Sequence, residues 1–354
     1  MESKFWKDKK TLITGHTGFK GSWLTLYLDT LGADLYGYAL EPETRPSLYQ
    51  EANLDNLMAK SCMGDINDLN KLTSFFRETK PSVLFHMAAQ SLVGEGFLYP
   101  IETFETNIIG TAKVIKAALE CDSLEAIVVI TSDKCYKNQE KSEGYIENDP
   151  LGGDDPYSAS KACAEIISQS MRSSFLNNKL CKLATVRAGN VIGGGDWAKD
   201  RLIPDCINAF SRGELLSLRN PKAIRPWQHV LEPLTGYLQL TEILCKEDDE
   251  MYSDAWNFGP NVDSQKSVEE VVGQISCLWG ESAKWQQESD GLNETNLLFL
   301  DNSKACKYLN WKPILDLQET IEMTVSWYKS FLSGQNCREI SINQLNNYLT
   351  RANK

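Results

Sequence analysis

The chain has 354 residues and carries 48 Asp and Glu against 36 Lys and Arg, a formal net charge of −12. This length suffices for one large domain or two ordinary ones with sizeable cores. The acidity argues against a nucleic-acid partner, because such partners require a basic surface that displaces counterions. A local basic pocket for a phosphorylated small molecule is compatible with it.

Cysteine and histidine usage bears on compartment and metals. Ten Cys are dispersed without a Cys-x-x-Cys pair and there are only three His, which argues against a disulfide scaffold and a metal site. The N-terminus lacks the apolar segment of a signal peptide, and no run reaches the roughly 20 apolar residues that cross a bilayer. We expect a soluble, cytoplasmic protein with no membrane partner, in which the sequon at Asn293 is unused.

In the first half of the chain, short β-branched runs alternate with helical segments. Strands are predicted over 10–14, 34–39, 83–86, 127–130 and 183–187. Between the first two, Leu24, Leu28 and Leu31 recur at helical spacing. Nearly continuous apolar runs fit buried parallel strands. The alternation predicts an α/β fold with a Rossmann-type, doubly wound parallel sheet.

The second half is less regular. Gly193–Trp197 and Pro221–Pro226 are loop-like, and helices are predicted over 267–278 and 317–332. We place a boundary near residue 188. Residues 1–188 then form the first domain, and 189–354 form mainly a smaller C-terminal α/β domain. We expect the chain to return to the first domain around 229–260.

Directly after the first predicted strand comes a glycine motif in which Gly15, Gly18 and Gly21 are spaced three apart. In such a motif the first glycine permits a tight turn, the second lets the backbone approach a pyrophosphate, and the third lets helix and strand pack closely. The N-terminus of the following helix adds N–H groups and a favourable dipole. We interpret the motif as a dinucleotide-binding turn; a plain glycine-rich turn is the alternative.

An acid that holds the ribose hydroxyls is expected at the end of the second strand. Only Glu41 is close to that position, so this part of the sequence leaves NAD and NADP open. Asp65 follows a third predicted strand and has two interpretations. It accepts from the adenine amino group, or it is the N-cap of a helix over 67–76.

Tyr157 and Lys161 stand at i and i+4, which places them on one face of a helix. A neighbouring ammonium stabilises phenolate and thereby lowers the pKa of a tyrosine towards neutrality. Tyr157 is therefore a candidate general base for a hydroxyl proton. An isolated pair of this kind is better explained by surface packing. The preceding glycine motif and the polar segment Thr131–Lys134 after a predicted strand favour catalysis.

In this order the motifs resemble those of the extended short-chain dehydrogenase/reductase family, over nearly the whole chain. The shared pieces are the glycine motif, Gly64-Asp65, His86–Gln90, Asn107–Gly110, Thr131–Lys134, and Tyr157 with Lys161. Longer stretches resemble the subfamily of CDP-glucose 4,6-dehydratases: Gly15–Trp23, Thr131–Tyr136, Glu147–Tyr157, Arg187–Trp197 and Arg225–Leu231.

The resemblance implies a reaction of deoxysugar biosynthesis. The C4 hydroxyl of CDP-glucose would lose its proton to Tyr157 while hydride passes to tightly bound NAD. Water would leave across C5 and C6, and hydride would return to C6, giving CDP-4-keto-6-deoxyglucose. The alternative is a 4,6-dehydratase or 4-epimerase for a different nucleotide-sugar. A binding protein without chemistry is disfavoured, because Tyr157 and Lys161 are both present.

The resemblance also implies roles for single residues. Ser132 would contact the C4 oxygen, Asp133 would protonate the leaving C6 hydroxyl, and Lys134 would remove the C5 proton. A strand-end ion pair is the alternative for Asp133 and Lys134. The implied cofactor-binding set is Gly15, Thr17, Gly18, Phe19, Gly21, Asp65, Ile66, Ala88, Ala89, Asn107, Tyr157 and Lys161.

The implied substrate-binding set is Gln90, Asn190, Arg201 and Arg225. A guanidinium suits a diphosphate, and Arg187 and Lys199 are further basic candidates, with salt bridges as the alternative. Stacking of Trp197 and Trp227 on a pyrimidine competes with core packing. We expect His229 to be structural.

One stretch departs from the subfamily, because Glu95 stands where a basic residue is expected. A carboxylate pointing inward would repel a diphosphate, whereas one that binds a sugar hydroxyl or faces solvent would not.

The family is usually dimeric through a four-helix bundle, here over 103–120 and 158–172. Ile108, Val114 and Ile115 fit the apolar stripe of such a bundle, and fit a face packed on the sheet equally well.

Overall fold

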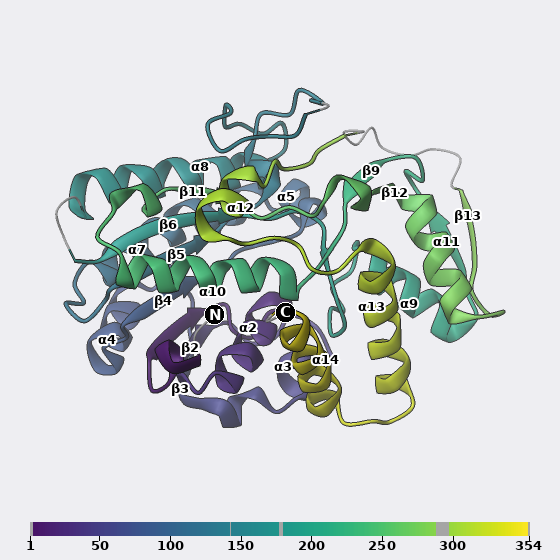
Figure 1. The fold of residues 1–354 in the computed structure, drawn as a ribbon, viewed down its shortest axis with the longest axis horizontal. Coiled ribbons are helices and arrows are strands. Elements are labelled where there is room, and N and C mark those ends of the chain that lie inside the picture. Colours follow the sequence, from purple (N-terminus) through teal and green to yellow (C-terminus); the bar gives the residue numbers. More distant parts are fainter. Residues whose placement is uncertain (1–2, 142, 177–179, 288–296, 353–354) are drawn as a thin grey trace.

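The β-branched runs of the first half assemble into one parallel sheet (Figure 1). The structure, a computed structural model, describes residues 3–141, 143–176, 180–287 and 297–352, so the sequon at Asn293 lies outside the described residues. Seven parallel strands follow the spatial order β11 (Ala255–Asn257), β6 (Lys182–Arg187), β5 (Ala126–Ile130), β4 (Val83–His86), β1 (Lys10–Thr14), β2 (Asp34–Ala39) and β3 (Met58–Met63).

The predicted α/β, doubly wound sheet is confirmed. Three predicted strands have the predicted bounds, and β5 and β6 begin one residue earlier than predicted. The strand order reverses between β1 and β4, and the carboxyl ends of parallel strands meet at one edge there. Ligands bind at such a switch point in doubly wound sheets.

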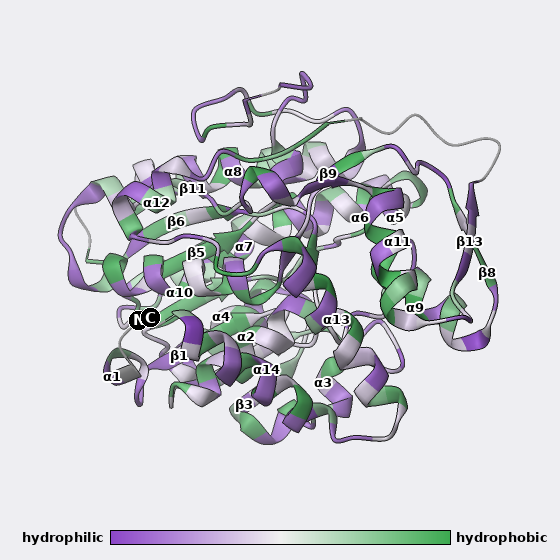
Figure 2. Ribbon diagram, turned by 45° about the vertical axis from the view of Figure 1, so that its right-hand side comes forward, coloured by the Kyte–Doolittle hydropathy of each residue, from purple (hydrophilic) through white to green (hydrophobic). Residues whose placement is uncertain are grey.

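Helices cover both faces of the sheet because the central strands β4 and β5 are buried on both sides. On one face lie α2 (Phe19–Thr30) and α10 (Leu231–Lys246), packed with Ile13 and Val128. On the other lie α4 (Leu69–Thr79), α7 (Thr111–Ala118) and α8 (Pro156–Met171), which contribute to a core around Leu12 and Ile127. Figure 2 shows hydrophobic residues along the central strands and hydrophilic ones in the outer loops.

Short elements join this frame in the first half. They are α1 (Ser3–Trp6), α3 (Leu48–Glu51), η1 (Leu54–Leu57), α5 (Val93–Leu98), α6 (Pro100–Phe104), the π-helix η2 (Glu105–Gly110), η3 (Asp133–Cys135) and the π-helix η4 (Arg172–Leu176). A run from α6 through η2 to α7 is continuous helix, and η2 interrupts its regular hydrogen bonding.

The second half adds three strand pairs and several helices. The pairs are β7 (Val191–Ile192) with β10 (Gln228–His229), β8 (Leu215–Leu218) with β13 (Lys284–Gln287), and β9 (Ile224–Pro226) with β12 (Gln265–Ser267). The helices are α9 (Leu202–Arg212), η5 (Glu250–Tyr252), η6 (Val262–Ser264), α11 (Val268–Trp279), α12 (Ser303–Leu309), α13 (Leu317–Leu332) and α14 (Cys337–Ala352). The two predicted helices are confirmed as α11, which begins after the N-cap Ser267, and α13.

Candidate functional site

The glycine motif forms the turn between β1 and α2. Gly15 has a φ of +76°, and a Cβ there would lie 2.6 Å from the backbone nitrogen of Ala88. A Cβ at Gly21 would lie 2.2 Å from the carbonyl oxygen of Gly15. Gly18, the exposed N-cap of α2, is different, because its Cβ would have no neighbour closer than 3.5 Å. The first turn of α2 is therefore open to an anion at Gly18.

The rest of the predicted cofactor set lies beside this turn. Thr17 donates to the carbonyl of Leu40 at 2.8 Å and so ties the turn to the end of β2. Ile66 is buried against Gly110, and Phe19 is half-buried beside Gly193.

Asp65 is exposed after β3, and its Oδ1 accepts from the backbone of Asn67 at 2.8 Å. The interpretation of Asp65 as a helix N-cap is wrong. Asp68 caps α4 by accepting from Lys71 at 3.0 Å, and the helix starts at Leu69 rather than at 67. The carboxylate of Asp65 remains exposed at the carboxyl edge of the sheet.

Asn107 connects the β4 segment to α8. It lies in the π-helix η2, a local deviation that often occurs at functional sites. Its Oδ1 accepts from Gln90 N at 2.8 Å, and its Nδ2 donates to Gln90 O at 2.9 Å and to Ser160 Oγ at 2.8 Å. The side chain of Gln90 also contacts Thr103, at 2.9 Å. Ala88 and Ala89 lie half-buried between Gly15 and this network.

The segment Thr131–Tyr136, called the catalytic turn below, leaves the end of β5. Ser132 is the N-cap of η3, and its hydroxyl donates to Asp133 Oδ1 at 2.9 Å. Asp133 is 3% exposed, and its Oδ2 has no hydrogen-bond partner within the described residues. Lys134 is half-buried. A strand-end ion pair between Asp133 and Lys134 is not among the salt bridges of the described chain.

Tyr157 and Lys161 occupy the first turns of α8, opposite the catalytic turn. Burial raises the pKa of Tyr157 to about 12, and a side-chain hydrogen bond with Ser132 opposes this increase. The prediction that Lys161 lowers this pKa towards neutrality is wrong for the chain by itself, because burial dominates. Burial also lowers the pKa of Lys161 to about 8, against the charge of Glu165. Lys161 Nζ donates to Ile130 O at 3.4 Å.

Lys20 is a site residue that the sequence reasoning missed. It lies in the first turn of α2, and burial together with the charges of Arg201 and Lys161 lowers its pKa to about 8. Asp133 acts on it in the opposite direction. The available signal was a lysine inside the glycine motif itself. The cations therefore gather at the carboxyl edge of the sheet despite the net charge of −12.

On the substrate side, Arg201 bridges the two halves of the chain. Its Nη1 donates to Asp196 Oδ2 at 2.8 Å, and its Nη2 donates to Ser91 Oγ at 2.7 Å. Asn190 follows β6 with a φ of +40°, a left-handed conformation that is uncommon outside glycine. Arg225 is buried on β9.

Arg187 and the two tryptophans have structural roles. Arg187 pairs with Glu165 at 2.9 Å, and both side chains are 3% exposed, so its interpretation as a ligand-binding cation is wrong. Trp197 packs against Trp327 and Phe331. Trp227 is buried and donates to the carbonyl of Lys266 at 3.0 Å.

His229 is fully buried, and burial lowers its pKa to about 3. Lys199 is exposed. Glu95 is exposed on α5, which agrees with the interpretation that it faces solvent.

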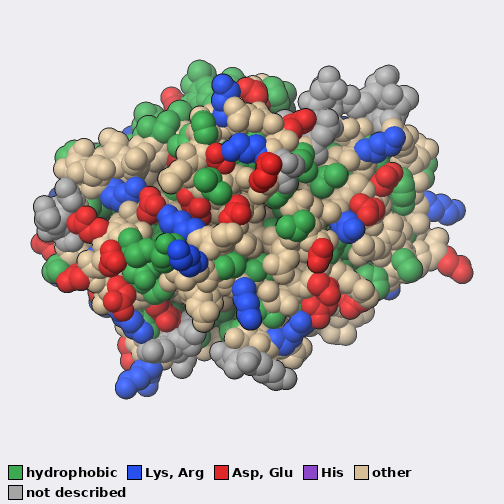
Figure 3. Space-filling model, turned by 45° about the horizontal axis from the view of Figure 1, so that its top comes forward, with side chains coloured by type: hydrophobic (Ala, Val, Ile, Leu, Met, Phe, Trp, Pro, Cys, Tyr) green, Lys and Arg blue, Asp and Glu red, His purple; other side chains and the backbone are tan. Residues whose placement is uncertain are grey.

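Neither a membrane helix nor a metal cluster takes part in this site. No helix in the described ranges is long and apolar enough to cross a membrane. No cluster of His, Cys, Asp and Glu that could hold a metal occurs in the same ranges. Figure 3 shows Lys and Arg interspersed with Asp and Glu over one face of the molecule.

Comparison with known proteins places this site in a family. A family model described as GDP-mannose 4,6 dehydratase matches residues 12–324. The chain therefore belongs to that family, within the extended short-chain dehydrogenase/reductases. The CDP-glucose 4,6-dehydratase of Salmonella typhimurium is 45% identical over 99% of both chains. The dTDP-D-glucose 4,6-dehydratase of Mus musculus is 24% identical over 94% of this chain and 92% of its own.

Solved structures support the fold. The UDP-glucose 4-epimerase from Brucella ovis, in complex with NAD, superposes with a TM-score of 0.77 at 19% identity, over 90% of this chain and 98% of its own. The epimerase Mth375 from Methanothermobacter thermautotrophicus superposes with a TM-score of 0.80 at 20% identity, over 94% and 95%. These likenesses show the shared fold.

Proposed function

We propose that the chain converts CDP-glucose to CDP-4-keto-6-deoxyglucose, as an NAD-dependent nucleotide-sugar 4,6-dehydratase. The observation that carries the proposal is the position of Asp133 in the catalytic turn, opposite Tyr157 and Lys161. Dehydration needs a proton donor for the leaving hydroxyl as well as a base, and this pairing supplies both. The 45% identity to the Salmonella CDP-glucose 4,6-dehydratase supports the choice of nucleotide.

The residues at the carboxyl edge of the sheet fit a dinucleotide. The open side of Gly18 would receive the pyrophosphate, and Asp65 is available to the adenine end. Thr17, Phe19, Ile66, Ala88, Ala89 and Asn107 would line the remainder, with Lys161 at the nicotinamide end. When bound, NAD supplies a hydride acceptor that later returns the hydride. NADP remains the alternative because the end of β2 holds only Glu41.

The protein groups then move three protons. Tyr157 takes the proton of the C4 hydroxyl, with Ser132 hydrogen-bonded beside it. The resulting C4 ketone acidifies the C5 proton, which Lys134 removes and gives back to C5 when hydride returns to C6. Asp133, which is buried in the catalytic turn, gives a proton to the leaving C6 hydroxyl.

The substrate-binding residues surround the same edge. Arg201 and Arg225 would bind the diphosphate, while Asn190 and Gln90 would orient it and the sugar. Because Glu95 is exposed on α5, we propose that it leaves CDP-glucose preference intact. Glu95→Arg should then change kcat/KM for CDP-glucose by less than about threefold.

The test is incubation of the purified chain with CDP-glucose, followed by the alkaline absorbance of a 4-keto-6-deoxy product. UDP-, GDP- and dTDP-glucose are the controls. Turnover of CDP-glucose alone, or far ahead of the others, supports the proposal. Turnover of another nucleotide-sugar without CDP-glucose would establish the alternative, a dehydratase or epimerase for a different nucleotide-sugar.

The domain organisation follows from the same assignment. We propose that residues 1–188, with the chain returning around 229–260, form the NAD-binding domain. Residues 189–354 would mainly form the substrate domain. The support is that β11 is a strand of the main sheet and α10 packs against that sheet, whereas the short strand pairs are separate from it.

We also propose a homodimer built through a four-helix bundle. Ile109 on η2 and Ile166 on α8 are 49% and 53% exposed, which supports an apolar surface on these helices. Val114 and Ile115 are fully buried and face the sheet core, so they do not belong to the stripe. Ile166→Glu should yield a monomer by light scattering.

A cytoplasmic location is supported by the cysteines, since no disulfide joins any of them and all ten lie in the described ranges.

A further inference from the structure

A fully buried ion pair lies directly behind the catalytic turn. Arg187 ends β6 and donates to Glu165 of α8 at 2.9 Å, with both side chains 3% exposed. Removing two charges from water is costly, so a buried pair is weak evidence for a stabilising role. The role of the pair is therefore better judged from the groups to which Glu165 and Arg187 are hydrogen-bonded.

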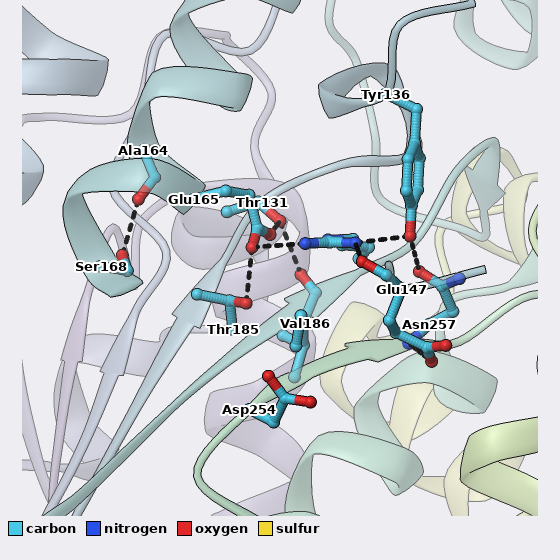
Figure 4. Close-up of polar contacts among 12 residues, drawn as sticks. Thr131, Tyr136, Glu147, Ala164, Glu165, Ser168, Thr185, Val186, Asp254 and Asn257 are labelled. Carbon is cyan, nitrogen blue, oxygen red and sulfur yellow. Dashed lines mark hydrogen bonds and ion pairs between the residues drawn. The ribbon is translucent and has the colours of Figure 1, made fainter. Parts of the chain in front are cut away.

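The pair holds the catalytic turn at both ends (Figure 4). At the first end, the Thr131 hydroxyl donates to Glu165 Oε1. At the last end, Arg187 Nη1 donates to the Tyr136 hydroxyl at 2.5 Å, and that hydroxyl donates to Asn257 Oδ1 at 2.8 Å. Ser132, Asp133 and Lys134 lie between these two anchors.

The same pair reaches the catalytic helix. Glu165 follows Lys161 by one turn of α8, and Lys161 Nζ contacts the carbonyl of Ile130, the residue before the turn. The charged or titratable groups that act on Lys161 or respond to it are Glu165, Cys135, Lys20 and His86. Of these, the Glu165 carboxylate is the one hydrogen-bonded to the catalytic turn.

We infer that Glu165 and Arg187 are positioning residues, which hold the proton donor of the catalytic turn in register with Tyr157 and Lys161. Neither needs to touch the substrate, because both act through Thr131, Tyr136 and Lys161. This inference rests on the proposed function, since it concerns how the same reaction is aligned. Small displacements of aligned groups reduce rates strongly.

Two threonines provide a matched test, because both donate to Glu165 and both are buried. Thr131 belongs to the catalytic turn, whereas Thr185 donates from β6 at 2.7 Å, where pairing with β5 and β11 fixes the backbone. Thr131→Val should lower kcat about tenfold or more. KM and NAD affinity should stay within about twofold. Thr185→Val should keep kcat within about twofold of the wild-type value. Its melting temperature should fall by about as much as that of Thr131→Val.

Three further measurements separate positioning from simple folding support. Amide hydrogen exchange over 132–135 should be faster in Thr131→Val than in Thr185→Val. Tyr136→Phe releases the other anchor and should lower kcat in the same way. Glu165→Gln removes the charge beside Lys161 and should move the alkaline limb of the kcat profile to lower pH.

Equal kcat in the two threonine variants, whether both fall or neither does, would overturn the inference. Unchanged exchange over 132–135 in Thr131→Val would do the same. If the wild-type chain fails to turn over CDP-glucose, the proposed function fails instead. The exchange comparison then still decides whether the pair holds the turn.

Discussion

The carboxylate of Asp133 is pressed against the backbone of Gly189: a Cβ at Gly189 would lie only 1.8 Å from Asp133 Oδ2. Oδ1 of the same carboxylate accepts from Ser132, while Oδ2 is buried and has no hydrogen-bond partner in the part of the chain that is described. The glycine after β6 therefore allows a buried acid to fit at the end of β5. That acid retains one oxygen for proton transfer.

Asp133→Asn should reduce formation of the dehydrated product about 10²- to 10⁴-fold, because an amide cannot deliver the proton. Steady-state turnover of CDP-glucose measures this. Asp68→Asn is the matched control, since Asp68 caps α4 and asparagine is an equally good N-cap. Wild-type turnover by Asp133→Asn would remove Asp133 from the mechanism.

Alanine substitutions should separate the roles of the glycines. Gly18→Ala should fold normally, because its Cβ meets nothing closer than 3.5 Å, yet weaken NAD binding about tenfold, which is about 1.4 kcal/mol. Gly15→Ala should instead lower the melting temperature, because of its positive φ and the backbone 2.6 Å away. Calorimetric titration and thermal melting provide the readouts. Normal NAD affinity in Gly18→Ala would contradict a pyrophosphate at this turn.

The pH dependence of turnover should show the titration of Lys161. Its pKa is lowered to about 8 by burial, so its positive charge is lost as the pH rises through that value. A positive charge one turn after Tyr157 on α8 favours phenolate, so its loss should make Tyr157 a weaker proton acceptor. We expect kcat to fall above about pH 8. Arginine stays protonated, so any residual activity of Lys161→Arg should lack this limb, and an identical limb would refute the assignment.

The stability of the C-terminal helix should depend on Glu232. This buried side chain of α10 accepts from Leu315 N at 2.7 Å and from Tyr348 OH at 3.0 Å, and burial raises its pKa to about 7. A raised pKa means that the folded state binds the proton more tightly, so the contribution is present at low pH and lost as the pH rises through about 7.

In the wild type, Glu232 should therefore lower the unfolding free energy by about 3 kcal/mol between about pH 5 and pH 8. Glu232→Gln should remove this fall. Chemical denaturation at several pH values measures it. An unchanged slope would show that Glu232 does not titrate on unfolding.

Most of the fold could be predicted from the sequence, because each strand of the sheet is marked by a local pattern of apolar residues. The strand over 34–39 and the helix over 317–332 have the predicted bounds, since each is set by its own apolar spacing. The start of α4 was misplaced because two aspartates compete for the cap. Only the backbone path after β3 decides that Asp68, not Asp65, accepts from the helix.

The site was less predictable where its roles depend on distant partners. The motif around Arg187 favours a ligand, but the partner Glu165 is 22 residues earlier and only the packing of α8 against β6 joins them. The place of Lys20 among the site cations could not be predicted either. It depends on Arg201, which reaches the site from the other half of the chain. The pairing of Tyr157 with Lys161 could be predicted from the sequence, because both residues lie on one face of a single helix.

In the proposed reaction, hydride leaves C4 and returns to C6 of the same sugar. The most direct measurement uses CDP-glucose deuterated at C4 and locates the label in the product by NMR and mass spectrometry. We expect deuterium at C6 of CDP-4-keto-6-deoxyglucose, with no accumulation of reduced cofactor. Deuterium retained at C4, or released into free reduced nicotinamide, would contradict it.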